Sequence, residues 1–202
     1  MARIARPEGA AEMRRRLLRA AYAAIAERGF AAVTLQDVAE RATVSKGLVL
    51  YYFKDKEQLL AAVMERTAEI IRARAERAMR EVAAQGPWAQ LEAYLGALTL
   101  GAQEHRDFYR VYLDFLSAGL RRAEVRRCTL DFIIGCSVLE HEAVTRGIAE
   151  GAFRRDLDPS EAAAVVRALI DGLSMQWLFR GDEPFDRFCQ RLHAAIFGYL
   201  GS

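Results

Sequence analysis

The chain has 202 residues, 52% of them hydrophobic, which is enough to bury a core in one domain or two small ones. Its 36 alanines and 22 leucines outnumber the 27 valines, isoleucines and threonines together, which excludes a mostly β fold and predicts an all-α protein. The net charge is only +2, from 29 basic and 27 acidic residues, so a wholly basic surface is excluded and nucleic-acid binding must be argued locally.

Membrane insertion and secretion find no support in the sequence. No apolar run approaches the roughly 18 residues of a spanning helix, and residues 1–16 lack the apolar centre of a signal peptide. The three cysteines form no Cys-x-x-Cys motif, which is typical of reduced thiols. We therefore expect a cytoplasmic protein with no membrane partner.

The charge is unevenly distributed along the chain. Residues 1–60 carry 11 basic and 7 acidic residues, a net charge of +4, and include all three lysines. Residues 61–202 carry 18 basic and 20 acidic residues, a net charge of −2. The basic surplus is thus confined to the first third of the chain.

Three helices are expected in this basic region, and the last two of them are short. A first helix over residues 12–28 ends at Gly29, and Thr34-Leu35-Gln36-Asp37 reads as a capping box that opens a second helix ending near Arg41. After a three-residue connection, Ser45 caps a third helix over residues 46–53. A short helix, a tight turn and a second short helix are the layout of a helix-turn-helix.

The last of these helices has an unusual outer surface. Val49 and Phe53, at i and i+4, are expected to point inward, which leaves Lys46, Gly47, Leu48, Leu50 and Tyr51 facing outward. Such a surface suits a DNA major groove, where thymine methyls take apolar contacts and phosphates take lysine, tyrosine and backbone amides.

These segments, with Tyr51-Tyr52-Phe53-Lys54-Asp55-Lys56-Glu57 behind them, closely resemble the DNA-binding region of the tetracycline-repressor (TetR) family over about residues 10–63. The resemblance implies an all-helical homodimer, an operator DNA partner, and release of that DNA when a ligand fills a C-terminal pocket. It implies a DNA-binding domain over residues 1–56, with a flexible arm over about 1–9, and a ligand-binding and dimerisation domain over 57–202. The DNA-binding residues that it implies are Thr34, Gln36, Ser45, Lys46, Gly47, Leu48, Leu50, Tyr51, Tyr52 and Lys56.

Two residues depart from the family's pattern. The recognition helix of the family usually carries a tyrosine where this chain has Leu50, which removes one hydroxyl–phosphate bond worth ~1 kcal/mol. The turn usually carries glycine where this chain has Thr43, and a β-branched residue is costly where φ is positive.

The rest of the chain is expected to form helices over about residues 55–84, 87–106, 107–118, 121–151, 159–180 and 184–200, with Asp158 as an N-cap. Residues 168–177 resemble the late helix of the betaine-choline type of TetR regulator.

The last two helices carry apolar stripes that serve either the protomer's own core or a four-helix bundle with a twofold mate. Dimerisation is favoured, because two recognition helices must lie about 34 Å apart to bind a pseudo-palindrome. The expected interface residues are Leu169, Leu173, Phe188, Leu192, Ile196 and Tyr199.

A ligand pocket is expected among aromatic and soft side chains, although such stripes are also typical of plain core. Asp114 with its aromatic neighbours is a candidate cage for a cation, and a neutral hydrophobic effector is the alternative. The expected lining residues are Tyr94, Phe108, Tyr109, Tyr112, Phe115, Phe132, Met175 and Trp177.

Catalysis and cofactors find little support. There is no phosphate-binding glycine loop, no Gly-x-Ser-x-Gly and no His-Glu-x-x-His motif. Cys189 and His193 share a helical face, but no second ligand pair accompanies them, so no metal site is predicted. The sequence predicts a ligand-responsive repressor that is not an enzyme; the alternative is a helical small-molecule-binding or catalytic protein that retains the helix-turn-helix fold.

Overall fold

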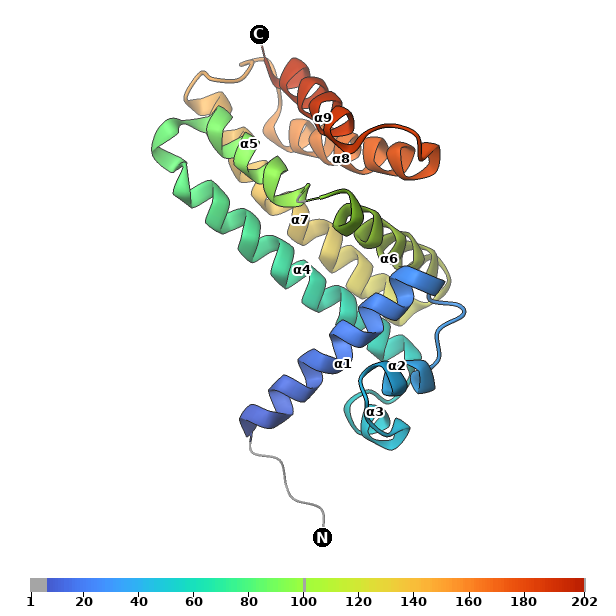
Figure 1. Cartoon of the computed structure of the whole chain (residues 1–202). Coiled ribbons are helices and arrows are strands. Elements are labelled where there is room, and N and C mark those ends of the chain that lie inside the picture. The colour runs from blue at the N-terminus through green and yellow to red at the C-terminus, as the bar shows by residue number, and fades with distance from the viewer. Residues whose placement is uncertain (1–6, 100, 202) are drawn as a thin grey trace. The chain divides into compact units, whose positions relative to one another are not determined.

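A computed structural model describes residues 7–99 and 101–201, and the description of side chains excludes residues 7, 8 and 124. Over these residues the chain forms α-helices and one short 3₁₀ helix and contains no strand, which confirms the expected fold class (Figure 1). Part of the expected N-terminal arm, residues 1–6, lies outside the described residues. The helices are α1 (Pro7–Arg28), α2 (Leu35–Arg41), α3 (Lys46–Tyr52), α4 (Lys56–Glu81), the 3₁₀ helix (Ala83–Gln85), α5 (Pro87–Leu98), α6 (Ala102–Arg121), α7 (Ala123–Ala149), α8 (Pro159–Arg180) and α9 (Phe185–Leu200).

Helix ends follow the capping residues that the sequence predicts. The Thr34 hydroxyl accepts a hydrogen bond from the Asp37 amide at 3.2 Å, and the Asp158 carboxylate accepts from the amides of Ser160 and Glu161 at 2.9 Å each. Gly29 ends α1 in the left-handed region, with φ +77°. These local hydrogen bonds satisfy backbone groups that a helix end would otherwise leave unpaired.

One helix boundary was wrong. The break expected between residues 106 and 107 lies earlier, around Thr99, whose amide bonds back to the carbonyl groups of Leu95 and Gly96. A β-branched residue and the nearby Gly101 are both poor helix formers, whereas the aromatic segment after them contains no helix breaker. All the aromatic residues from Phe108 to Phe115 therefore lie on the single helix α6.

The chain folds as two compact units. The first unit comprises Met1–Thr67 and Arg110–Leu130, and the second comprises Ala68–Tyr109 and Asp131–Ser202. The first unit therefore extends beyond the domain boundary expected at residue 56 and includes the end of α6 and the start of α7.

The first unit positions the helix-turn-helix. Helix α2 contacts both α1 and α3, and Val38, Ala39, Val49 and Phe53 are almost completely buried.

In the second unit α8 and α9 lie side by side (Figure 1). Their shared core takes in α5 and α7, and its fully buried large side chains include Leu91, Leu95, Phe153, Phe188, Leu192 and Ile196.

By length and composition alone, α8 is apolar enough to cross a membrane, which amends the expectation that no segment approaches such a helix. Its apolar side is nevertheless used inside the protein, because Val166, Ile170 and Trp177 are buried in the core of the second unit. Helices buried in a protein core share this composition with membrane spans.

Candidate DNA-binding and effector sites

Helix α3 separates its buried and exposed side chains as predicted. Val49 and Phe53 are 0% and 1% exposed, whereas Leu50 and Tyr51 are 45% and 82% exposed. The rings of Tyr51 and Tyr52 meet edge to face, with centroids 5.3 Å apart. An apolar leucine and a tyrosine thus project from a helix whose opposite side is anchored in the core.

The backbone before α3 is the turn of the helix-turn-helix. Thr43 adopts φ +54°, the left-handed conformation that the family's usual glycine at this position implies, and its amide donates to the Glu40 carbonyl at 2.9 Å. A β-branched residue here is strained. Ser45 then caps α3 by accepting from the Leu48 amide at 3.2 Å.

The side chains of Thr34 and Gln36 both form hydrogen bonds to acidic residues of α2. The Thr34 hydroxyl donates to the Asp37 carboxylate at 2.6 Å, and the Gln36 side-chain amide donates to Glu40 at 2.8 Å. Hydrogen bonds from the Thr34 side chain and backbone, and from Arg28, lower the pKa of Asp37 to about 2. The start of α2 therefore carries a carboxylate that stays ionised at neutral pH.

Lys56, at the start of α4, turns toward the connection between α1 and α2. Its Nζ donates to the Ala31 carbonyl at 3.0 Å and lies 4.4 Å from the centroid of the Phe30 ring. Burial is the main cause that lowers the pKa of Lys56, and the nearby Arg122 lowers it further. A phosphate contact by Lys56 stays a prediction.

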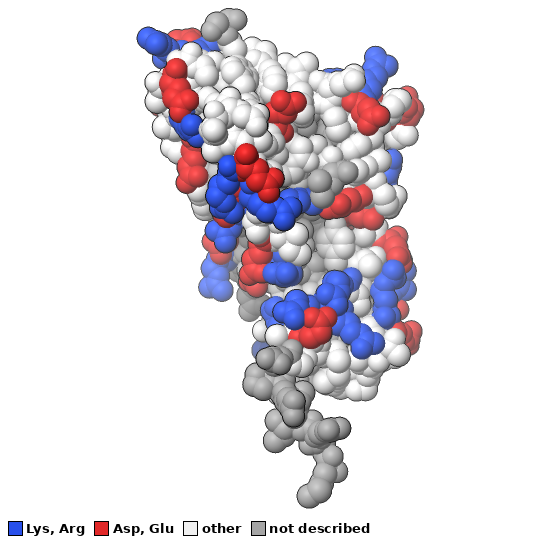
Figure 2. All heavy atoms as spheres, turned by 60° about the vertical axis from the view of Figure 1, so that its left-hand side comes forward, with Lys and Arg blue, Asp and Glu red and all other residues white. Residues whose placement is uncertain are grey.

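Surface charge agrees with the small net charge. Figure 2 shows basic and acidic side chains interspersed over one face rather than gathered in a single basic area. Several arginines of α1 and α2 pair locally, such as Arg15 with Glu12 at 2.7 Å and Arg41 with Glu27 at 2.5 Å.

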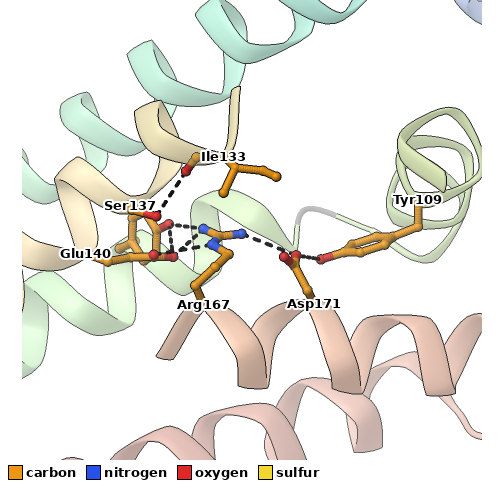
Figure 3. A network of polar contacts seen from close by, with 7 residues as sticks. Tyr109, Ile133, Ser137, Glu140, Arg167 and Asp171 are labelled. Carbon is orange, nitrogen blue, oxygen red and sulfur yellow. Dashed lines mark hydrogen bonds and ion pairs between the residues drawn. The ribbon is translucent and has the colours of Figure 1, made fainter. Parts of the chain in front are cut away.

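The second unit contains a buried polar network on four helices (Figure 3). Arg167 of α8 forms an ion pair with Glu140 of α7 and lies 3.4 Å from Asp171, one turn later on α8. The Tyr94 hydroxyl donates to Glu140 at 2.7 Å, and the Tyr109 hydroxyl donates to Asp171 at 3.0 Å. Two carboxylates thus share one guanidinium.

Burial controls the electrostatics of this network. The Glu140 side chain is fully buried, and burial raises its pKa although Arg167 opposes the shift. The network holds two carboxyl groups, Glu140 and Asp171, against the single guanidinium of Arg167. Such an interior favours a cation over an anion, because an unbalanced buried charge is costly.

Aromatic rings gather in the same unit around His105 of α6. The imidazole centroid lies 4.9 Å from Tyr109, 5.1 Å from Phe188, 5.5 Å from Phe185 and 5.6 Å from Trp177. Burial lowers the pKa of His105 to about 4, so the imidazole is neutral at physiological pH.

The eight predicted pocket residues do not form one group. Six belong to the second unit, where Phe108 contacts both Tyr109 and Phe132. Tyr112 and Phe115 are buried in the first unit instead. The corrected break between α5 and α6 explains this result. All these α6 residues lie on one continuous helix, whose first half belongs to the second unit and whose second half belongs to the first unit.

Asp114 does not form the predicted cage for a cation. Its carboxylate belongs to the first unit and accepts a hydrogen bond from the Phe30 amide at 2.6 Å. No local pattern in the sequence indicates this contact, because the two residues are 84 positions apart.

Three of the predicted dimer residues are covered by their own protomer. Phe188, Leu192 and Ile196 are 0% exposed and lie in its core, so their side chains are not on the protomer's surface. Leu169, Leu173 and Tyr199 are partly buried and pack against the same core. The outward sides of α8 and α9 instead present Ala164, Ala168, Phe179, Ala194 and Gly198, all exposed.

The sequence also missed the charged residues of the polar network. Glu140 stands in the run Glu140-His141-Glu142 and is the buried member of that run. Arg167 and Asp171 are spaced i and i+4 in the largely apolar middle of α8, and that pattern could have identified them.

Metal binding gains no support from the geometry. Within residues 7–99 and 101–201, no three or more His, Cys, Asp or Glu side chains are grouped as metal ligands would be. The His193 ring packs 5.8 Å from Phe197, and burial raises the pKa of Cys189.

Family models account for both parts of the chain. The model for bacterial regulatory proteins of the tetR family matches residues 17–63, and that for the C-terminal domain of BetI-type transcriptional repressors matches residues 87–200. The HTH-type transcriptional regulator BetI of Burkholderia thailandensis is 33% identical over 184 residues, which cover 88% of each chain. BetI of Paraburkholderia xenovorans is 31% identical over 182 residues, again 88% of each chain.

Solved structures give the same result. A transcriptional regulator from Saccharomonospora viridis in complex with choline superposes with a TM-score of 0.83 at 25% identity, over 95% of this chain and 99% of that one. A TetR-family regulator from Rhodococcus sp. superposes with a TM-score of 0.78 at 25% identity, over 95% of this chain and 100% of that one. The chain therefore belongs to the tetR family of bacterial regulatory proteins, with a BetI-type C-terminal domain, and is a ligand-responsive, DNA-binding transcriptional regulator.

Proposed function

We propose that this protein is a cytoplasmic, non-enzymatic repressor that binds a pseudo-palindromic operator as a homodimer. The observation that carries the proposal is the division of α3, where Val49 and Phe53 anchor the helix while Lys46, Leu50 and Tyr51 project from it. Leucine side chains suit thymine methyls, and lysine and tyrosine suit phosphates.

The proposed dimer uses the outward sides of α8 and α9. Small exposed residues there, Ala164, Ala168, Ala194 and Gly198, allow two helix pairs to approach closely. Phe179, at 79% exposure, is a large apolar side chain that a partner would cover. A twofold dimer would supply the two α3 helices that a pseudo-palindromic operator requires.

The proposed effector is a small organic cation such as choline. The buried network has two carboxyl groups, Glu140 and Asp171, for the one guanidinium of Arg167, and aromatic rings such as Tyr109 and Trp177 lie in the same unit. Aromatic faces and a negative charge together are what recognise a quaternary ammonium group. The regulator from Saccharomonospora viridis that was solved with choline supports the same class of ligand.

Operator binding can be tested by fluorescence anisotropy with duplexes from the region upstream of the protein's own gene. The wild-type protein should bind one duplex with salt-dependent affinity at least ~1000-fold above its nonspecific affinity. The variants Lys46→Ala and Tyr51→Ala should lose that preference, and a control variant at an exposed position outside α3, α8 and α9, Gln85→Ala, should keep it. Nonspecific affinity alone in the wild-type protein would reject the proposal.

Choline is then added to the complex of protein and operator. The expected result is a weaker operator affinity, with a reciprocal loss of choline affinity when DNA is bound. Release by a neutral hydrophobic ligand of similar size, but not by choline, would reject the cationic effector and leave the operator result intact.

A further inference from the structure

A cavity of about 340 Å³ lies within the first unit. Its size falls in the range of small-molecule pockets. Its described lining residues come from residues 29–34 between α1 and α2, from the start of α4, and from the end of α6 and the residue after it. None of them belongs to α3 or to the buried polar network, so the cavity is a candidate binding site in its own right.

Both acidic residues of the cavity wall already have partners within the protein. The Asp114 carboxylate accepts a hydrogen bond from the Phe30 amide at 2.6 Å. Glu57 forms an ion pair with Arg122, which follows the last residue of α6. A cationic ligand would therefore have to compete with an existing donor for either carboxylate.

Two basic residues of the wall lack such a partner. Within residues 7–99 and 101–201, neither Lys56 nor Arg121 forms an ion pair with an acidic side chain. The Lys56 Nζ donates to the Ala31 carbonyl at 3.0 Å and lies 4.4 Å from the centroid of the Phe30 ring. Burial, and after it the charge of Arg122, lower the pKa of Lys56, so its surroundings disfavour a positive charge that a bound anion would offset.

The side of α6 that faces the cavity combines polar and apolar groups. Its lining residues Asp114, Ser117, Ala118 and Arg121 follow the spacing i, i+3, i+4 and i+7, which places them on one face of the helix. The Phe30 ring adds apolar surface from the connection between α1 and α2. Unpaired cations beside apolar surface suit a ligand that has an anionic group and an apolar body.

We propose that this cavity binds a small organic carboxylate with an apolar body. Lys56 and Arg121 hold the carboxylate, and the apolar part lies against Phe30. A guanidinium group binds a carboxylate through two parallel hydrogen bonds, which favours Arg121 as the main anchor. The proposal requires neither the operator nor the effector of the second unit, because every residue that it uses belongs to the first unit.

The test uses the full-length protein without DNA and benzoate as the probe. Benzamide has the same ring without the charge, and inorganic phosphate has the charge without a ring. Calorimetric titration gives the dissociation constant of each compound, and the NMR signal of the Phe30 amide reports whether benzoate binds at the cavity.

Three variants locate the site. Arg121→Gln and Lys56→Gln remove one cation each from the cavity wall. Arg16→Gln is the matched control, since Arg16 is an exposed arginine of α1 that does not line the cavity. Urea unfolding of each variant verifies that it is folded at the temperature of the titration.

Benzoate should bind the wild-type protein saturably, with a dissociation constant of about 1 mM or lower, and should shift the Phe30 signal. Benzamide and phosphate should each bind at least ~10-fold more weakly, because each lacks one half of the recognised group. Arg121→Gln and Lys56→Gln should each weaken benzoate binding by about 5-fold or more, and Arg16→Gln should bind as the wild-type protein does.

Three results would overturn the inference. The first is the absence of saturable benzoate binding to the wild-type protein. The second is equally strong binding of benzamide or phosphate, because charge and apolar body would then not be recognised together. The third is benzoate binding that leaves the Phe30 signal unchanged and is as strong in Arg121→Gln as in Arg16→Gln, because the ligand would then occupy a different site.

Discussion

The guanidinium of Arg28, the last residue of α1, lies 3.0 Å from the carboxylate of Asp37 in the first turn of α2. The same carboxylate accepts hydrogen bonds from the amide and the hydroxyl of Thr34 at 2.7 and 2.6 Å. One side chain therefore both caps α2 and joins it to the preceding helix.

The first prediction concerns the pH dependence of this junction. Because the pKa of Asp37 is lowered from 3.8 to about 2, its ionised form stabilises the fold above about pH 4, and this contribution is lost as the pH falls toward 2. Asp37→Asn should therefore unfold at a lower urea concentration than the wild-type protein at pH 7, and the difference should shrink below pH 4. Urea unfolding at a series of pH values measures this.

Asp182→Asn is a suitable control, since Asp182 is exposed in the second unit. An equal, pH-independent effect of both substitutions would contradict the role given to Asp37.

The second prediction concerns the departure at Leu50. A tyrosine, which the family usually carries there, would add a hydroxyl donor for phosphate, and Leu50 is 45% exposed, so the larger side chain has room. Leu50→Tyr should tighten operator binding by about fivefold, the equivalent of ~1 kcal/mol. Leu50→Phe supplies the ring without the hydroxyl; an equal gain from both variants would show that the hydroxyl is irrelevant. Anisotropy titration distinguishes them.

The third prediction tests the proposed dimer surface. A Cβ at Gly198 of α9 would meet no atom of its own protomer within 4 Å, and the same holds for Gly96 of α5. Gly198→Arg should leave the protomer folded, because Gly is a poorer helix former than Arg, but should convert a dimer into a monomer. Multi-angle light scattering after gel filtration gives the mass. A dimer that persists in Gly198→Arg, or is lost equally in Gly96→Arg, would place the interface elsewhere.

The fourth prediction concerns the buried pair of Arg167 and Glu140. Arg167→Met leaves the fully buried Glu140 carboxylate without its cation, which should cost about 3–5 kcal/mol of the free energy of unfolding at neutral pH. Burial already raises the pKa of Glu140, and loss of Arg167 raises it further, so the penalty is greatest at high pH and shrinks as the pH falls and Glu140 is protonated.

Urea unfolding at pH 5 and pH 8 measures this difference. The double variant Glu140→Met, Arg167→Met should regain much of the stability, because two apolar side chains need no charge compensation. A double variant less stable than Arg167→Met would argue against an uncompensated carboxylate as the cause.

The helix-turn-helix was predictable because its determinants are local. Thr34 with Asp37, Ser45 before α3, and the positive φ of Thr43 each depend on contacts within a few residues. The buried positions of Val49 and Phe53 follow from helical periodicity alone.

The effector and dimer surfaces were harder to predict because they depend on which helices meet. An apolar stripe on α9 predicts that this side of the helix is buried. It does not show whether the covering helix belongs to a partner subunit or is α8 of the same protomer. Phe188 and Leu192 lie in the core that α9 shares with α8. Asp114 and Phe30 lie 84 residues apart, and no local pattern joins them.

The first unit is discontinuous in sequence, since it needs Arg110–Leu130 as well as the N-terminal 67 residues. A fragment that ends after α3 would expose apolar surface that Val111, Phe115 and Val125 help to bury. The first unit, which contains the helix-turn-helix, therefore cannot be separated from the rest of the protein by a single cut in the gene. Exchange of the ligand-sensing unit between relatives must preserve three junctions, one each in α4, α6 and α7.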